Sequence, residues 1–177
     1  MFLSKKNTFA KNTDVTIKVQ DETFTAHRFV LAARSPVLAA MFENDMTEKK
    51  TGLIDIRDCD PKAFKHFLLY LYSGELDSVN CDFFHLHKIA DKYDVPELKL
   101  MSVDFIIHHV SLENFCEIYV FGCQFNEDKI LTKIQDFFNE NFEKIVFLNG
   151  WELFLKENAC LANNLLKAMA PNIRLKK

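Results

Sequence analysis

At 177 residues the chain can hold one ordinary domain with a small appendage, and a chain of this size can bury a self-sufficient core. Its net charge is −3 and its one basic cluster is residues 174–177, which excludes the broad basic surface that nucleic-acid binding requires. No apolar run fits a signal peptide or a membrane span. We therefore expect an intracellular protein of the nucleus, the cytoplasm or both.

The first third of the chain predicts a small sheet with two short helices. Residues 14–19 alternate apolar and polar side chains, which is typical of a strand with one buried face. A polar turn follows, and then a return strand. The predicted elements are strands at 14–19, 23–26 and 53–56 and helices at 27–33 and 37–42, with Ser35-Pro36 between the two helices.

From Asp60 onward the apolar residues recur at helical spacing. Asp60 is a candidate N-cap, Pro61 suits the first helical position, and Ser73-Gly74 ends this helix. The further predicted helices are one at about 82–93, one opening at Pro96, one after Ser111 as a possible N-cap, one capped by Asn126, and two short ones within 151–169 around Glu157-Asn158. Strands first and helices afterwards predict an α+β fold.

The sequence carries no pattern that indicates catalysis. Five cysteines contain no CxxC pair and mostly fall inside apolar helical patterns, so we expect reduced core residues. His85 and His87 lack a partnering Cys motif, and His27 is expected to be a hydrogen-bonded structural residue. Only four glycines occur, and none forms a phosphate-binding loop. We therefore expect no enzyme, no cofactor and no metal.

Three passages, in this order and at these separations, resemble the BTB/POZ family. They are residues 12–15 leading into 24–37, residues 41–42 with the acidic run after them, and residues 67–74 followed by 90–93. The resemblance covers about residues 12–110. It implies a BTB/POZ fold, which is a small three-stranded sheet flanked by a helical cluster.

Within that family the chain is most similar to the speckle-type POZ subgroup, through residues 111–114 (Ser-Leu-Glu-Asn) and the pair Gly150-Trp151. Members of the subgroup carry a substrate-binding MATH domain before the BTB domain, whereas only a short segment precedes it here. The predicted organisation is an N-terminal segment at 1–11, a BTB/POZ domain at 12–110, a helical extension (3-box or partial BACK) at 111–170 and a basic tail at 171–177.

The resemblance implies a dimer interface at Asp14, Arg28, Val30 and Leu31. In BTB domains the positions of Asp14 and Arg28 form a buried pair at the dimer centre, and the position of Val30 packs across the two-fold axis. Without the resemblance, Asp14 and Arg28 are ordinary surface charges. The helix at 27–33 is apolar nearly all round, which favours cover on more than one side.

A second resemblance concerns Met46-Thr47-Glu48. BTB adaptors of cullin-3 ubiquitin ligases place a hydrophobic residue, any residue and Glu in the loop after the Met-Phe helix, where the hydrophobe enters a groove of the cullin. Met46 and Glu48 are therefore candidate cullin contacts, and Tyr93 is a secondary one. Residues 111–148 resemble the 3-box, which widens that contact. Without this resemblance, Met46 would be expected to be a solvated loop residue.

The sequence therefore predicts a non-catalytic, dimeric BTB adaptor that recruits cullin-3 and helps to present a protein substrate for ubiquitination. Its partners would be the cullin-3 N-terminal domain and a second copy of itself or a related BTB protein. One alternative is a scaffold or transcription-regulatory dimerisation module without cullin binding. Another is a relative without a MATH domain that modulates full-length adaptors by heterodimerisation.

Overall fold

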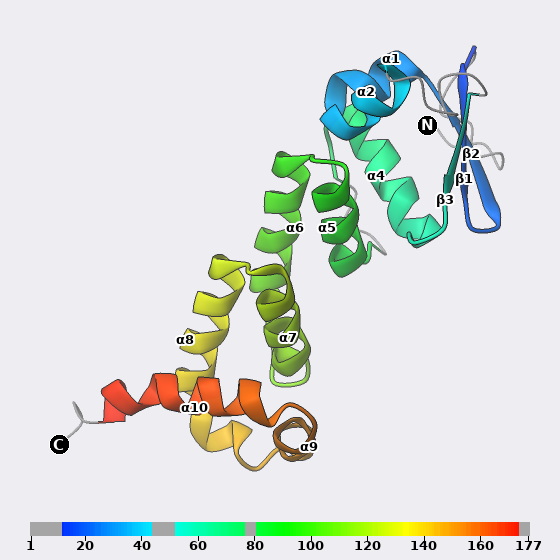
Figure 1. Ribbon diagram of the computed structural model, residues 1–177. Helices are drawn as coiled ribbons and strands as arrows, with labels where there is room; N and C mark the ends of the chain where they lie inside the picture. Colours follow the sequence, from blue (N-terminus) through cyan, green and yellow to red (C-terminus); the bar gives the residue numbers. More distant parts are fainter. Residues whose placement is uncertain (1–11, 44–51, 77–80, 174–177) are drawn as a thin grey trace. The chain divides into compact units, whose positions relative to one another are not determined.

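The computed structural model describes residues 12–43, 52–76 and 81–173, with side chains up to Ala168. Within these ranges the chain forms three strands and nine helices (Figure 1). They are β1 (Val15–Val19), β2 (Glu22–Ala26), α1 (Arg28–Arg34), α2 (Pro36–Glu43), β3 (Leu53–Ile56), α4 (Pro61–Ser73), α5 (Phe83–Lys92), α6 (Pro96–His108), α7 (Phe115–Phe125), α8 (Asp128–Ile145), α9 (Asn149–Glu157) and α10 (Ala159–Ile173). The α+β fold with a C-terminal helical extension is confirmed.

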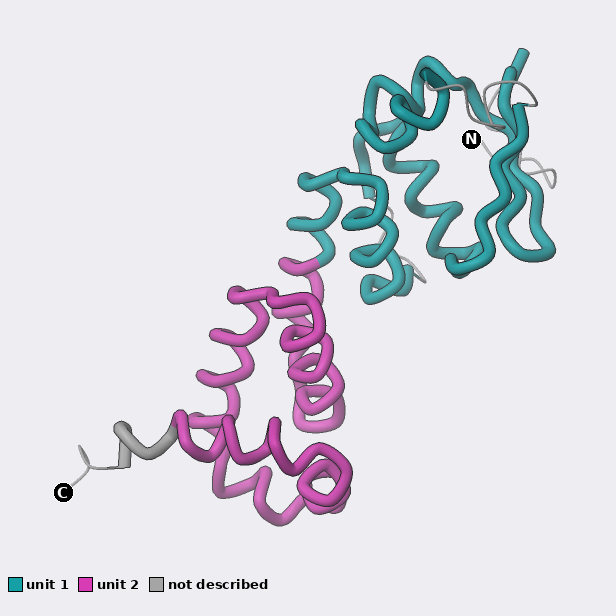
Figure 2. The backbone as a smooth tube through the Cα atoms, in the orientation of Figure 1, with its two compact units in different colours: residues 1–102 teal, residues 103–177 magenta. Residues whose placement is uncertain are grey.

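The chain divides into two compact units, Met1–Ser102 and Val103–Lys177 (Figure 2). The division falls inside α6. Unit 1 contains the sheet and the helices packed with it, and every described element of unit 2 is a helix. Our predicted extension begins at residue 111, beyond this division, and that boundary stays a prediction.

The sheet has the order β2-β1-β3, with β1 at its centre. β1 pairs antiparallel with β2 and parallel with β3, and the register places Ile17 opposite Phe24 and Ile54. Ile17, Phe24 and Ile54 are all buried. Val15 and Val19 are buried as well, so the alternating pattern of residues 14–19 correctly identified the buried face of β1. A two-residue turn at Gln20-Asp21 joins β1 to β2, with Gln20 at a positive φ of 52°.

Short-range capping explains where α4 begins and ends. Asp60 accepts a hydrogen bond from the backbone N–H of Ala63 at 2.8 Å, and Pro61 occupies the first turn. Gly74 takes the left-handed conformation, with φ of 73°, and its N–H donates to the carbonyl of Tyr70. Both predicted ends of this helix are confirmed.

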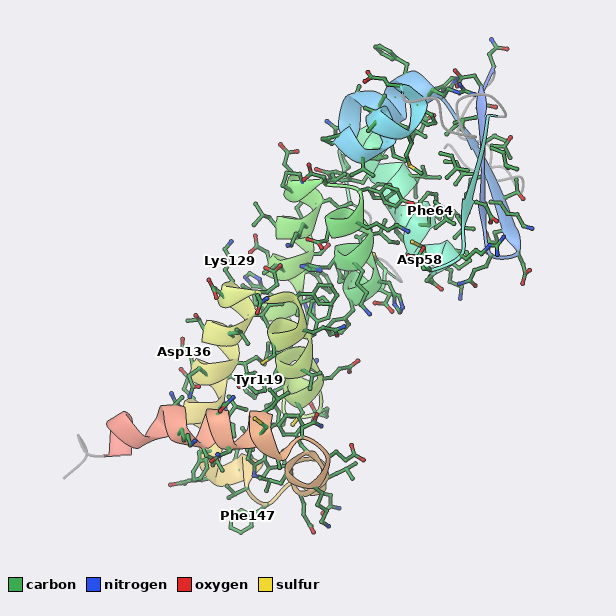
Figure 3. The ribbon with its side chains drawn as sticks, in the orientation of Figure 1. Asp58, Phe64, Tyr119, Lys129, Asp136 and Phe147 are labelled. Carbon is green, nitrogen blue, oxygen red and sulfur yellow. The ribbon has the colours of Figure 1, made fainter. Side chains whose placement is uncertain are left out.

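The core of unit 1 is a cluster of aromatic rings under the sheet. Phe64, labelled on α4 in Figure 3, contacts Phe24 in β2, with ring centres 5.7 Å apart. The ring centres of Phe67 and Tyr93 lie 5.4 Å apart. None of these four side chains is more than 1% exposed. This cluster joins the sheet, α4 and the end of α5, and it accounts for several of the chain's phenylalanines.

Unit 2 has its own aromatic core, formed by Phe115, Phe138, Trp151 and Phe154. The ring of Trp151 lies 5.1 Å from Phe138 and 5.7 Å from Phe154. α7 and α8 approach closely where Gly122 faces Ile130. The predicted break at Asn158 is confirmed, although the helices on either side extend further than 151–169.

Two predicted helix starts in unit 2 are wrong. α7 begins at Phe115 rather than directly after Ser111, because Asn114 holds a turn in which its side chain accepts from Ser111 N and donates to His109 O. Asn126 does not cap α8; it ends α7 with a left-handed φ of 52°. Asparagine suits both an N-cap and a left-handed C-cap, so its identity alone could not decide between them.

Candidate interaction surfaces

Asp14, which precedes β1, lies against Arg28, the first residue of α1. The Asp14 carboxylate accepts a hydrogen bond from the backbone N–H of Arg28 at 2.8 Å. The preceding residue, His27, makes no side-chain cap, so Asp14 supplies a cap to α1 from outside the helix. Asp14 is exposed and Arg28 is partly exposed in the single chain, so both keep surface that a partner could cover.

The side chains that follow Arg28 differ sharply in exposure. Phe29 is 84% exposed, although a phenylalanine of a folded domain is ordinarily buried. Val30 is partly exposed. The sequence analysis did not place Phe29 in the dimer interface. A large apolar residue next to Val30 was the signal that could have indicated it. Among the large apolar side chains of α1, Phe29 is therefore exposed and Val30 is partly exposed.

Leu31 does not fit the predicted dimer interface. Its side chain is wholly buried within the chain, so it has no surface to offer to a second subunit. The apolar pattern around α1 arises because Leu31 faces the protein's own core while Phe29 and Val30 face outward. We therefore correct the predicted interface by removing Leu31.

Tyr93 does not fit the predicted cullin contact, for the same reason. It is 1% exposed and packs against Phe64 and Phe67. Burial raises the pKa of its hydroxyl. Its carbonyl accepts a hydrogen bond from Ser35 Oγ at 2.6 Å. Tyr93 is thus a core residue.

The other two predicted cullin contacts, Met46 and Glu48, lie outside the described residues. The segment that carries them, residues 44–51, follows α2 directly and precedes Gly52 and β3. The residues that border this segment, Glu43 and Gly52, are described. Both flanks belong to unit 1.

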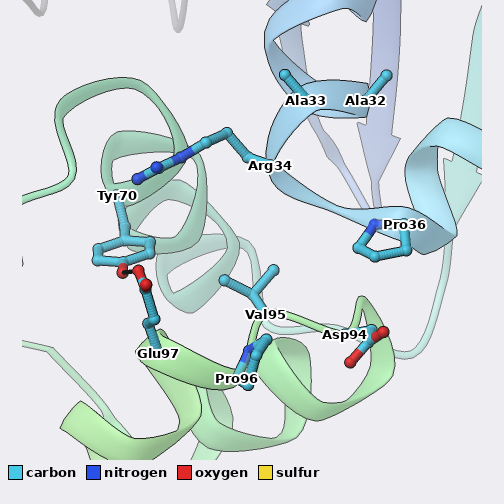
Figure 4. Close-up of a pocket in the computed structure, with 9 residues that line it drawn as sticks. All are labelled: Ala32, Ala33, Arg34, Pro36, Tyr70, Asp94, Val95, Pro96 and Glu97. Atoms are coloured by element: carbon cyan, nitrogen blue, oxygen red, sulfur yellow. Dashed lines mark hydrogen bonds between the residues drawn. The ribbon is translucent and has the colours of Figure 1, made fainter.

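A groove of about 400 Å³ lies in unit 1 between the α1–α2 junction and the start of α6 (Figure 4). The Arg34 guanidinium carbon is 5.7 Å from the centre of the Tyr70 ring, and the Tyr70 hydroxyl donates to Glu97 at 3.2 Å. Burial, followed by the hydrogen bond to Glu97, raises the pKa of Tyr70. Arg34 and Glu97 therefore both already contact Tyr70 within the chain, one at its ring and the other at its hydroxyl.

His27 and two of the cysteines show what the structure makes of residues that could carry chemistry. His27 donates its backbone N–H to the Tyr72 hydroxyl at 2.8 Å, and its ring nitrogen Nδ1 lies 3.0 Å from the same oxygen, which confirms a structural role. Burial raises the pKa of the Cys116 thiol to about 12, so it is a poor nucleophile. Cys160 is exposed, contrary to our expectation of core cysteines.

The described ranges hold neither a metal-binding cluster nor a membrane-spanning helix. No group of three or more His, Cys, Asp or Glu side chains there is placed to hold a metal ion. No helix among residues 12–43, 52–76 and 81–173 is long and apolar enough to cross a membrane.

Comparison with known proteins agrees with this architecture. The BTB/POZ domain family model matches residues 3–110, which is more than half of the chain. The chain is similar to TD and POZ domain-containing protein 4 of Mus musculus, with 29% identity over 163 residues. That alignment covers 89% of this chain and 43% of the relative, so the chain spans less than half the length of the curated relative it matches.

BTB/POZ domains commonly dimerise and bind other proteins, and they are generally interaction modules without catalytic activity. The three-stranded sheet, the helices around it and the extent of the family match lead to one conclusion. This chain belongs to the BTB/POZ family.

Proposed function

We propose that this protein is a non-catalytic, dimeric BTB adaptor that recruits a cullin-3 ubiquitin ligase and helps to present a protein substrate. The observation that carries the proposal is the continuation of the BTB/POZ domain, matched at 3–110, into the four helices α7 to α10. In the speckle-type adaptors that the sequence resembles, a helical extension at this place widens the contact with the cullin. The substrate is unassigned.

The proposed dimer is a symmetric homodimer centred on Val30. Phe29 supports this proposal because a side chain that is 84% exposed gains the most from cover by a second subunit. Asp14 and Arg28 lie at the beginning of the same helix and would join the interface. A dimer would raise the avidity for multivalent substrates without any new contact.

The proposed cullin contact rests on Met46 and Glu48. A flexible methionine in a polar segment is the kind of residue that adaptable interfaces use, and a neighbouring acid gives the contact an orientation. Residues 111–148 would extend the contact. The proposal no longer includes Tyr93, which is buried.

The burial of Tyr93 favours a second candidate, because it removes one of three predicted cullin contacts. In this alternative the protein is a BTB scaffold or transcription-regulatory module that dimerises and binds another protein without a cullin. The two candidates share the dimer and differ in whether residues 44–51 and 111–148 contact a cullin.

One experiment separates them. Size-exclusion chromatography with light scattering would measure the chain alone and after mixing with the cullin-3 N-terminal domain. We expect a mass of twice 20.6 kDa alone and a larger complex after mixing. The double variant Met46→Ala, Glu48→Ala should lose the complex, whereas Lys49→Ala, Lys50→Ala in the same segment should keep it. A dimer that never binds the cullin would favour the scaffold.

A further inference from the structure

The hydroxyl of Tyr72 holds the residue at which the chain passes from β2 into α1. That residue is His27, which lies between Ala26 at the end of β2 and Arg28 at the start of α1. The backbone N–H of His27 donates to the Tyr72 hydroxyl oxygen at 2.8 Å, and Nδ1 of its ring lies 3.0 Å from the same oxygen. Tyr72 belongs to α4, 45 residues further along the chain. One hydroxyl of α4 therefore contacts both the backbone and the ring of His27.

The first turn of α1 is held by groups from outside the helix. His27 is extended, with φ of −104° and ψ of 122°, and its side chain makes no cap hydrogen bond. Distant residues satisfy two donors here, because Asp14 accepts from the N–H of Arg28 at 2.8 Å and Tyr72 accepts from the N–H of His27. The N–H of Leu31 donates to the His27 carbonyl at 3.1 Å and closes the turn. The direction in which α1 leaves the sheet is thus set at His27.

The side chains that the proposed dimer uses follow His27 directly. Phe29 is 84% exposed and Val30 is partly exposed, whereas Leu31 is wholly buried. Successive side chains of an α-helix point about 100° apart around its axis, so a rotation of this turn would carry Phe29 and Val30 away from their outward positions. Leu31 fixes the inner side of the turn, and His27 fixes its beginning. The orientation of Phe29 and Val30 therefore depends on how firmly His27 is held.

We propose that Tyr72 is a positioning residue that holds the first turn of α1 through His27 and thereby sets the strength of the proposed dimer. The first part concerns only bonds within one chain, in which loss of the Tyr72 hydroxyl loosens His27 and the turn that follows it. The second part rests on the proposed function, in which a second copy of this chain packs on Phe29 and Val30.

The physical reason is the preorganisation of the turn. A turn that is already held in its bound orientation has fewer conformations to lose when a second subunit covers it, so less of the binding free energy is spent on ordering it. A single hydrogen bond within a protein contributes a modest net free energy, which corresponds to about two- to tenfold in an equilibrium constant. A symmetric dimer contains two such turns, so loss of the hydroxyl should raise the dissociation constant by about four- to a hundredfold.

Tyr70 offers a matched control. It lies two residues before Tyr72 in α4, and its hydroxyl also makes a hydrogen bond to a distant residue, the Glu97 carboxylate of α6 at 3.2 Å (Figure 4). Burial raises the pKa of both hydroxyls, so the two groups lie in comparable surroundings. Tyr70→Phe and Tyr72→Phe each remove one hydroxyl and keep the ring. Only Tyr72→Phe releases His27.

The first measurement needs no dimer. Amide hydrogen exchange would be followed by nuclear magnetic resonance in Val30→Lys, which is expected to be monomeric, and in Val30→Lys combined with Tyr72→Phe or with Tyr70→Phe. With Tyr72→Phe we expect the His27 and Leu31 amides to exchange about two- to tenfold faster than in Val30→Lys alone, and with Tyr70→Phe at unchanged rates. A Leu31 amide that exchanges equally fast in the two combined variants would overturn the proposal, because the turn would then not depend on Tyr72.

His27→Phe tests the same contact from its other side. It removes the ring nitrogen that lies 3.0 Å from the Tyr72 hydroxyl, and it keeps the backbone N–H that donates to this hydroxyl. In the Val30→Lys background we expect it to speed exchange of the Leu31 amide about twofold, less than Tyr72→Phe does. This variant provides the test if Tyr72→Phe does not fold, and an unchanged Leu31 amide would then overturn the proposal.

The second measurement is the dissociation constant of the dimer, by analytical ultracentrifugation over a dilution series. It compares the wild type, Tyr72→Phe and Tyr70→Phe at a temperature where all three are folded by circular dichroism. We expect the dissociation constant of Tyr72→Phe to exceed that of Tyr70→Phe by about four- to a hundredfold. Equal constants would overturn the second part. If the wild type is a monomer at every concentration, the proposed dimer fails, and faster exchange with Tyr72→Phe still supports the first part.

Discussion

Ser35 Oγ donates a hydrogen bond to the carbonyl oxygen of Tyr93 at 2.6 Å, across 58 residues of sequence. The same hydroxyl oxygen accepts from the backbone N–H of Leu38 at 3.1 Å, so Ser35 also caps the first turn of α2. Its side chain is wholly buried. One hydroxyl therefore joins the α1–α2 junction to the turn between α5 and α6.

Replacing Ser35 by Ala should destabilise the protein by about 1–3 kcal/mol, because the buried Tyr93 carbonyl loses this donor and α2 loses its cap. Urea denaturation measures this change. Ser73→Ala is the control, since the Ser73 hydroxyl is exposed and bonds only nearby backbone, and its effect should stay within about 0.5 kcal/mol. Equal effects for the two variants would contradict the importance of the Ser35–Tyr93 bond.

Replacing each of the two glycines of unit 2 by alanine should change the stability of the protein differently. A Cβ on Gly122 would lie 2.8 Å from Ile130 Cγ2, whereas a Cβ on Gly150 would meet nothing within 4 Å. Gly122→Ala should therefore cost about 1–3 kcal/mol through overpacking of α7 against α8. Gly150→Ala should be neutral or stabilising by up to about 1 kcal/mol, because Gly150 lies in a helix. Thermal unfolding monitored by circular dichroism would rank the variants.

The ion pair of Asp58 with Lys92 should stabilise the fold slightly, by an amount that depends on pH. Lys92 Nζ lies 2.6 and 2.9 Å from its two carboxylate oxygens, and this hydrogen bond lowers the pKa of Asp58 below 3.8. A carboxyl whose folded pKa is lowered stabilises the fold above its ordinary pKa and loses that effect as pH falls through the folded value.

Asp58→Asn should thus lower the free energy of unfolding at pH 7 by less than about 1 kcal/mol, because the pair is largely exposed. The difference from the wild type should shrink as the pH falls below 3.8, and salt at about 1 M should reduce it at pH 7 through screening. Urea titrations at several pH values measure both effects. A difference that grows toward acid pH would show that the sign is wrong.

Val30→Lys tests the proposed dimer directly. A charge at the centre of an apolar interface should halve the mass measured by light scattering, because a buried unpaired ammonium is costly to desolvate. Leu100→Lys is the control, since Leu100 is an exposed apolar residue of α6, 51% accessible, and its replacement should leave the mass unchanged. If Val30→Lys remains dimeric, the interface does not contain Val30.

Patterns that act within a few residues were predicted correctly from the sequence. Asp60 and Gly74 bound α4 as expected, because capping depends on the identity of one residue and its immediate backbone. The helix expected at about 82–93 is α5, and the structure adds that Asp82 caps it through the N–H groups of Phe84 and His85. The strand alternation located the sheet for the same local reason.

The side chains of the candidate site were harder to predict, because their exposure depends on distant residues. Leu31 and Tyr93 look like surface candidates by position, yet the core of unit 1 buries both. Conversely, Phe29 reads as one more core phenylalanine until the orientation of α1 shows it exposed. The partner of His27 could not be anticipated, since Tyr72 lies 45 residues away in α4.

The parallel pairing of β1 with β3 bears on how the molecule folds. Thr16 pairs with Leu53, so β3 can join the sheet only after the chain has crossed the whole stretch that holds α1, α2 and residues 44–51. Closing so long a connection is entropically costly, and early helix formation in α1 and α2 shortens the distance to be closed. The proposed partner surfaces therefore also lie on the route by which the sheet is completed, so insertions there should slow refolding as well as alter recognition.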